Sequence, residues 1–248
     1  MDTECMITGR NSVTEALKAG RSITKLYLAA GNTSSQLQRI WDLARDRHIL
    51  VEQVPAKVLN QMAQGSRHQG VVAFAAAIDF ADLTDVLADV TAQGRVPFLV
   101  LLDGVEDVHN VGAIIRTAEC AGVDAVLIPK RHSAPINETV GKTSAGAIEY
   151  VPIVQIGNIT QTLRGLQKRG FWVIGADMEG QTDYFHSTLT VPVVLVVGSE
   201  GKGISRLVKE ACDVLVQIPM FGSINSLNAS VAAALLIYEV VRQRQAVT

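Results

Sequence analysis

The sequence predicts an α/β protein in which a mostly parallel sheet follows a smaller α/β domain. Hydrophobic residues make up 48% of the 248 residues and charged residues 19%, which is enough for a substantial core. Only 5% are aromatic, so that core must consist mainly of aliphatic side chains. From residue 97 onward, short apolar runs alternate with stretches of helical periodicity. This alternation predicts helices on both faces of a parallel sheet, with ligands beyond the carboxyl ends of its strands.

The first 78 residues have the pattern of a small α/β domain. Leu37, Ile40 and Trp41 recur at helical spacing, whereas residues 23–28 alternate like a strand. Gly65 is suited to end a helix. The pattern predicts helices over 12–17, 34–48 and 56–64 and strands over 23–28, 49–54 and 71–77.

Residues 79–96 differ in composition from the parts on either side. Four aspartates (Asp79, Asp82, Asp85 and Asp89) are interleaved with leucine and valine, which indicates an amphipathic connector helix. We therefore expect a first domain over 1–78, a linker over 79–96 and a second domain over 97–248.

The second domain begins with a continuous apolar run over 98–102, as expected of a strand that is buried on both faces. Further strands are predicted over 125–128, 171–176, 193–197 and 214–218, and helices over 112–121, 137–144, 159–169, 204–211 and 227–244. The last of these helices has almost no polar face before Arg242. A helix that is apolar all round is buried on several sides, so one side is expected to meet a partner chain.

Charge and cysteine content limit the classes of function. A net charge of −2 argues against a protein that binds nucleic acid by neutralising phosphates over its whole surface. Residues 1–79 carry nine Lys and Arg against seven Asp and Glu, which leaves room for a local RNA-binding patch. The three cysteines lack metal-ligand spacing and indicate a reducing compartment. No apolar stretch is long enough to cross a membrane, so we expect a cytoplasmic protein that needs no metal.

Three segments that follow buried strands carry candidate chemistry. In the first, residues 107–118, Asn110 offers a donor and an acceptor, and Arg116 offers a fork of donors suited to phosphate. Because Arg116 comes six positions after Asn110, the first turns of one helix can bring both near the same cleft. The alternative is that Asn110 caps the helix and Arg116 forms a surface ion pair.

The second segment, residues 196–204, has three glycines in six residues and would let the backbone approach a ligand closely. It matches neither a phosphate-binding loop of the Walker type nor a dinucleotide fingerprint. Glu200 lies among these glycines and is a candidate functional carboxylate; the alternative is a plain turn with a solvated glutamate.

The third segment, residues 218–230, places Asn225, Ser226, Asn228 and Ser230 between a strand and the apolar last helix. Helix capping explains one of these polar residues but not all four.

Taken together and in this order, the three segments resemble the three motifs of the SpoU (TrmH-type) RNA 2′-O-ribose methyltransferases of the SPOUT superfamily. The resemblance covers roughly residues 98–244. Residues 9–17 and 67–71 resemble the RNA-binding substrate domain of the subgroup that methylates guanosine in bacterial 23S ribosomal RNA.

The resemblance implies a deep trefoil knot, a homodimer and S-adenosylmethionine as the methyl donor. It implies a catalytic set of Asn110, Arg116, Glu200, Ser226 and Asn228 and cofactor contacts at Ala176, Gly198, Ile218, Met220 and Leu227. The family often has proline where this chain has Val108, a difference that removes no functional group. The family proposal makes the arginine a base, which conflicts with the strong basicity that keeps a guanidinium protonated in proteins. Stabilisation of a developing alkoxide is a simpler role for Arg116.

Three other functions remain open from the sequence. A tRNA ribose methyltransferase would share the motifs of the second domain, although residues 1–79 favour ribosomal RNA. A non-catalytic RNA-binding assembly protein would have no need of Asn110, Arg116, Glu200 and Asn228 together. A nucleotide-dependent enzyme is disfavoured because residues 198–203 lack the phosphate-loop lysine pattern.

Overall fold

The computed structural model describes residues 4–32 and 34–246, which fall into two compact units. The first unit combines Met1–Asp79 with Ile136–Tyr150, and the second combines Phe80–Pro135 with Val151–Thr248. The chain therefore passes between the units three times. None of the helices in the described ranges is long and apolar enough to span a membrane.

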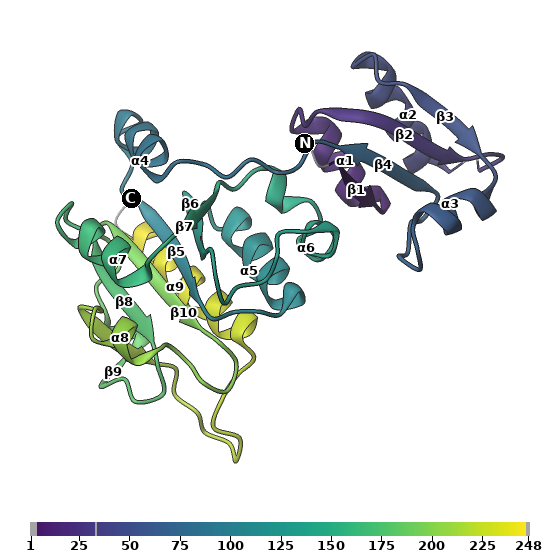
Figure 1. The fold of residues 1–248 in the computed structure, drawn as a ribbon. Helices are drawn as coiled ribbons and strands as arrows, with labels where there is room; N and C mark the ends of the chain where they lie inside the picture. Colours follow the sequence, from purple (N-terminus) through teal and green to yellow (C-terminus); the bar gives the residue numbers. More distant parts are fainter. Residues whose placement is uncertain (1–3, 33, 247–248) are drawn as a thin grey trace. The chain divides into compact units, whose positions relative to one another are not determined.

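The first unit is a four-stranded sheet in the order β1-β4-β2-β3 (Figure 1). β4 pairs antiparallel with β1 and β2, and β2 pairs parallel with β3. One core cluster joins the sheet to α1 and α2 through residues such as Leu17 and Ile40, and a second forms around Leu59 of α3. The elements are β1 (Cys5–Thr8), α1 (Arg10–Lys18), β2 (Ile23–Ala29), α2 (Ser35–Asp46), β3 (Val51–Val54), α3 (Ala56–Met62) and β4 (Val71–Ala75).

Residues 136–150 complete this unit, although they come much later in the sequence. They form α6 (Glu138–Thr143) and the short 3-10 helix η1 (Ala147–Glu149). Arg21 Nη1 lies 2.6 Å from Glu149 Oε1, and the Tyr150 hydroxyl donates to Glu15 Oε2 over 2.6 Å. Burial raises the pKa of the Glu149 carboxyl against the opposing effect of Arg21. This long-range packing makes 136–150 a structural part of the N-terminal unit.

The second unit is a seven-stranded sheet in the order β7-β6-β5-β10-β8-β11-β9, and all its strand pairs are parallel (Figure 1). The predicted α/β class with a mostly parallel sheet is thus confirmed. The strands are β5 (Phe98–Asp103), β6 (Ala125–Pro129), β7 (Ile153–Ile156), β8 (Trp172–Ala176), β9 (Thr182–Asp183), β10 (Val193–Gly198) and β11 (Val214–Gln217). The helices are α4 (Leu83–Ala92), α5 (Val108–Cys120), α7 (Ile159–Gln167), η2 (Tyr184–His186), α8 (Arg206–Lys209) and α9 (Ala229–Gln245).

Helices cover both faces of this sheet because its strands are apolar on both sides. Leu99 and Leu101 of β5 share a core cluster with residues of α4, α7 and α8. Side chains alternate along a strand, so Val100 and Leu102 point to the opposite face, where α9 contacts both α5 and β10. The expected connector helix within 79–96 is α4, and its Val86 belongs to this core.

The last helix is less uniformly buried than its composition indicates. Leu236 and Val240 are buried within the chain, whereas Val231, Leu235 and Tyr238 are 48%, 38% and 49% exposed. These three positions are spaced four and three residues apart, so they form one apolar stripe on the outer side of α9.

Candidate active site

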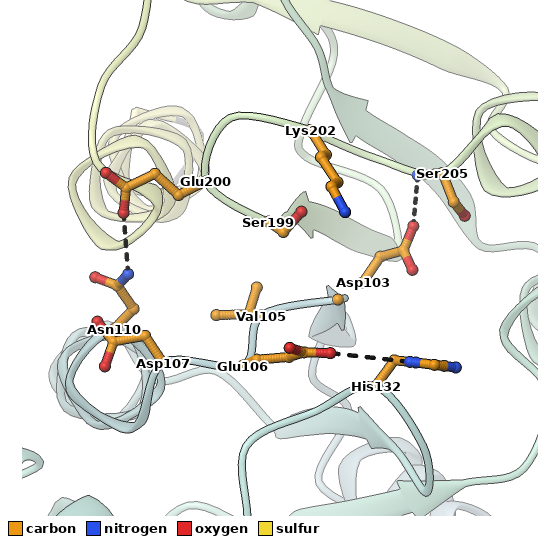
Figure 2. Close-up of a pocket in the computed structure, with 12 residues that line it drawn as sticks. Asp103, Val105, Glu106, Asp107, Asn110, His132, Ser199, Glu200, Lys202 and Ser205 are labelled. Carbon is orange, nitrogen blue, oxygen red and sulfur yellow. Dashed lines mark hydrogen bonds and ion pairs between the residues drawn. The ribbon is translucent and has the colours of Figure 1, made fainter.

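A cleft of about 650 Å³ opens at the carboxyl end of the second sheet (Figure 2). β5 leads to β6 and β7 on one side, whereas β8 to β11 lie on its other side, so the strand order reverses between β5 and β10. This is the position where open α/β sheets bind ligands. The cleft is lined by Asp103, Gly104, Val105, Glu106, Asp107, Asn110, His132, Ser199, Glu200, Lys202, Gly203 and Ser205.

Three predicted catalytic side chains meet at one end of this cleft. Asn228 Nδ2 donates to Asn110 Oδ1 over 2.9 Å and to Glu200 Oε2 over 3.3 Å. Asn110 Nδ2 also donates to Glu200 Oε2, over 3.4 Å. We call these three residues the amide–carboxylate cluster. It joins the first turn of α5, the loop after β10 and the start of α9.

Local structure explains why each member of the cluster points inward. Asp107 is the N-cap of α5 and accepts from the His109 amide over 2.9 Å, so Asn110 does not cap this helix and is free to turn its buried side chain toward Glu200. Asn228 is the N-cap of α9: its Oδ1 accepts from the Ser230 amide over 2.9 Å, which leaves its Nδ2 for the cluster.

Steric crowding explains why the loop after β10 contains glycine at position 198. Ser199 and Gly203 form a tight bridge, with the Gly203 amide donating to the Ser199 carbonyl over 2.9 Å. A Cβ atom on Gly198 would lie 2.1 Å from the carbonyl carbon of Gly203. Only glycine fits there, and the resulting turn carries Glu200 and Lys202 at the cleft.

Arg116 and Ser226 lie outside this arrangement. Arg116 is exposed on α5, and its side chain forms neither a hydrogen bond nor an ion pair with any residue that the structure describes, so the alternative of a surface ion pair is not observed. Ser226 is exposed in the irregular segment before α9. The chain by itself therefore brings together three of the five predicted catalytic residues.

Three of the five predicted cofactor residues lie at the ends of neighbouring strands. Ala176 ends β8, Gly198 ends β10, and Ile218 directly follows β11. Leu227 is half-buried next to the cluster residue Asn228, whereas Met220 is 36% exposed.

Two contacts fix the loop after Ala176. Asp177 Oδ2 lies 2.7 Å from Lys209 Nζ, and this bond raises the pKa of the Lys209 ammonium. Gly180 packs so closely on the β11 backbone that a Cβ atom would lie 2.5 Å from the Val216 carbonyl carbon.

Several cleft residues are not among the sequence candidates. Asp103 ends the apolar strand β5, and its Oδ2 accepts from the Ser205 amide over 2.7 Å. Glu106, His132 and Lys202 line the cleft from three different loops. Of these, only Asp103 could have been found from the sequence, because it is a carboxylate at the end of a buried apolar run. Within the described ranges, no group of three or more His, Cys, Asp or Glu side chains could hold a metal ion.

A parallel α/β sheet with a polar cleft at its switch point defines a ligand-binding enzyme of the open α/β class. Two family models match this chain: the SpoU rRNA methylase family over residues 97–238, and the substrate-binding domain of RNA 2′-O-ribose methyltransferases over residues 6–81. The chain belongs to the SpoU/TrmH family of RNA methyltransferases.

Relatives extend this similarity over nearly the whole chain. YacO of Bacillus subtilis, whose name places it in the TrmH family of tRNA/rRNA methyltransferases, is 44% identical over 97% of this chain and 96% of its own length. A TrmH family relative from Staphylococcus saprophyticus is 43% identical over the same shares. The crystal structure of the SpoU methyltransferase AviRb from Streptomyces viridochromogenes matches with a TM-score of 0.82 at 27% identity, covering 98% of this chain and 90% of that one.

Proposed function

We propose that this enzyme transfers the methyl group of S-adenosylmethionine to the ribose 2′-hydroxyl of a guanosine in 23S ribosomal RNA. The observation that carries the proposal is the amide–carboxylate cluster, two of whose members, Asn110 and Glu200, line the open cleft. AviRb in complex with this cofactor has a TM-score of 0.81 to this chain at 26% identity, covering 98% of this chain and 91% of that one.

The cluster is suited to holding a hydroxyl group for reaction. When bound, S-adenosylmethionine supplies an electrophilic methyl group on a sulfonium. Glu200 Oε2 accepts from two amides and keeps them in place, and Asn110 and Asn228 together present both donors and acceptors to a ribose. Transfer in line between two bound groups depends mainly on such positioning.

We further propose that the enzyme is a homodimer in which Arg116 of one copy serves the cluster of the other. Two observations support this arrangement. Arg116 is exposed and outside its own cluster, and the apolar stripe of Val231, Leu235 and Tyr238 lies on α9, which packs beside α5. The fixed guanidinium charge would stabilise the developing alkoxide. We also propose that the second domain contains the trefoil knot that the family resemblance implies.

Methyl transfer to defined RNAs tests the function. The full-length protein is incubated with tritiated S-adenosylmethionine and a bacterial 23S ribosomal RNA transcript, and resistance of the backbone to alkali maps the modified ribose. We expect one 2′-O-methylguanosine, and calorimetry should show binding of S-adenosylhomocysteine but not of ATP. Label on a base, or saturable ATP binding without binding of S-adenosylhomocysteine, would refute the proposal.

A tRNA substrate is the second candidate, because the names of the curated relatives include tRNA as well as rRNA. A parallel incubation with bulk bacterial tRNA separates the two: preferential labelling of tRNA would replace the ribosomal substrate while leaving the reaction itself unchanged.

A further inference from the structure

We propose that the cleft receives the base of the acceptor nucleotide and that Glu106 selects guanine by accepting hydrogen bonds from its Watson–Crick edge. This inference rests on the proposed function and adds the group that reads the base. Enzymes that do chemistry on a base bind it out of its stack and read that edge by hydrogen bonding and stacking, and the same contacts can hold the base next to a reacting ribose.

Strand order separates the cleft from the predicted cofactor residues. The cleft lies over the loops that follow β6, β5 and β10, whereas Ala176 and Ile218 stand at the ends of β8 and β11, on the other side of β10. Glu200 is on the loop after β10, between the two. A ribose held at the amide–carboxylate cluster carries its base one glycosidic bond away, and the hollow within that reach is the cleft (Figure 2).

The charge of the lining favours a base over a phosphate. Lys202 is the single lysine or arginine among the lining residues, against the carboxylates Asp103, Glu106, Asp107 and Glu200. This excess of negative charge repels a phosphate group but suits a neutral ring that presents N–H donors, because ionised carboxylates only accept hydrogen bonds.

Glu106 is the lining carboxylate that accepts no hydrogen bond from the described residues, so both of its oxygens are available to such a ring. Asp103 accepts from the Ser205 amide, Asp107 from the His109 amide, and Glu200 from the cluster. Among the residues that the structure describes, the one partner of Glu106 is His132, whose Nδ1 lies 3.9 Å from its Oε1. Guanine presents two adjacent donors, N1–H and the 2-amino group, which match both oxygens of one carboxylate. Adenine, cytosine and uracil each lack such a pair on this edge.

His132 gives this position a stacking surface. Its φ of 56° lies in the left-handed region, which non-glycine residues seldom adopt. Flanking bonds hold it there: the Ala134 amide donates to the Val105 carbonyl over 3.1 Å, and Ser133 Oγ donates to the Pro129 carbonyl over 2.5 Å. An imidazole beside Glu106 can stack on an unpaired base while the carboxylate reads its edge (Figure 2).

A cycle that combines protein and base substitutions tests the inference. The full-length wild type first maps the methylated nucleotide on the 23S transcript, and a second RNA then carries inosine, which lacks the 2-amino group, at that site. The variant is Glu106→Gln, and the control is Glu210→Gln, an exposed glutamate outside the cleft that pairs with Arg206. The readouts are kcat/KM on both RNAs and calorimetric affinity for S-adenosylhomocysteine.

We expect Glu106→Gln to lower kcat/KM on the guanosine RNA by about 5- to 150-fold, the range for one bidentate base contact. Affinity for S-adenosylhomocysteine should stay within about twofold, as should all properties of Glu210→Gln. On the inosine RNA the wild type should be slower, and Glu106→Gln should add a smaller further loss, because the two changes remove a shared contact.

Several results would overturn the inference. They are equal losses from Glu106→Gln on both RNAs, an equal loss in Glu210→Gln, or weakened binding of S-adenosylhomocysteine. A wild type that methylates no ribose at all would instead refute the proposed function, so the two failures are distinguishable.

Discussion

Asn228 combines a helix cap and two bonds within the amide–carboxylate cluster in one side chain. Its Oδ1 caps α9 while its Nδ2 donates to Asn110 and Glu200. Asn228→Ser keeps a good helix cap but removes the side-chain amide that donates to the cluster. Its free energy of unfolding, measured in urea, should stay within about 0.5 kcal/mol of the wild type, whereas that of Asn228→Ala should fall by about 1 kcal/mol. Both variants should transfer methyl groups at least about tenfold more slowly in initial-rate assays. Near-normal turnover of the serine variant would remove Asn228 from the catalytic set.

Arg116 allows a similar separation of stability from activity. Because its side chain is exposed and without a bonded partner among the described residues, Arg116→Ala should change the free energy of unfolding by less than about 0.5 kcal/mol. Turnover should fall by about 100-fold, as when a donor that stabilises a developing oxyanion is removed. Arg116→Lys keeps the charge but loses the planar fork and should recover part of the rate. An alanine variant with normal turnover would contradict the assignment.

The meeting of the proposed catalytic residues could be predicted from the sequence only in part. The motifs indicate Asn110, Glu200 and Asn228, but Asn110 and Glu200 are 90 residues apart and their contact depends on the sheet order. The placement of Glu106 and His132 at the same cleft gave no sequence signal, because each is an ordinary polar residue in a loop. Arg116 shows the opposite case: its motif is clear, yet the single chain leaves it outside the cluster.

At the level of helices and strands, the sequence predicted the periodic helices better than the short strands. Helices with strong periodicity, such as α2, lie within one or two residues of their predicted bounds. The strands β1, β7 and β9 were not predicted, although β3 and β11, which have four residues like β1 and β7, were. α5 begins at Val108 and not at the predicted residue 112, because the cap of Asp107 outweighs the poor helix propensity of Gly112.

The β10 loop offers a test of its steric requirement. Gly198→Ala would force a Cβ atom against the Gly203 backbone and should reduce the free energy of unfolding by about 1–3 kcal/mol or more. The control is Gly165→Ala on the exposed side of α7, where an added Cβ atom would meet nothing within 4 Å. This substitution should stabilise the chain by about 0.5–1 kcal/mol. Urea unfolding measures both. Equal effects of the two substitutions would show that the Gly198 turn is looser than the structure indicates.

For the whole molecule, the first expectation concerns its domains. A chain that begins at Phe80 keeps α4 and should bind S-adenosylhomocysteine by calorimetry, but it should lose most methyl transfer to RNA because it lacks the substrate-binding domain. A companion chain that begins at Arg95 also lacks Val86 and Leu87 of the core and should be less stable. Full activity of the shorter enzymes on RNA would show that residues 1–79 do not recognise the substrate.

The second expectation concerns the proposed homodimer. Leu235→Glu places a charge on the exposed apolar stripe of α9 and should give monomers, measured by light scattering, with much reduced methyl transfer. Gln245→Glu, at the exposed end of the same helix, is the control and should leave the dimer intact. A substitution at the buried Leu236 or Val240 would test folding and not association. A fully active native monomer would refute the shared site.

Residues 136–150 also have a consequence for synthesis on the ribosome. The N-terminal unit needs this segment to cover β1 and α1, and the segment is translated only after β5, α5 and β6 of the other unit. At 5–20 residues per second, the unit waits about 4–14 seconds between the emergence of residue 79 and that of residue 150. During that interval Arg21 lacks Glu149, and the faces of β1 and α1 that later meet α6 and η1 are open to solvent or to chaperones.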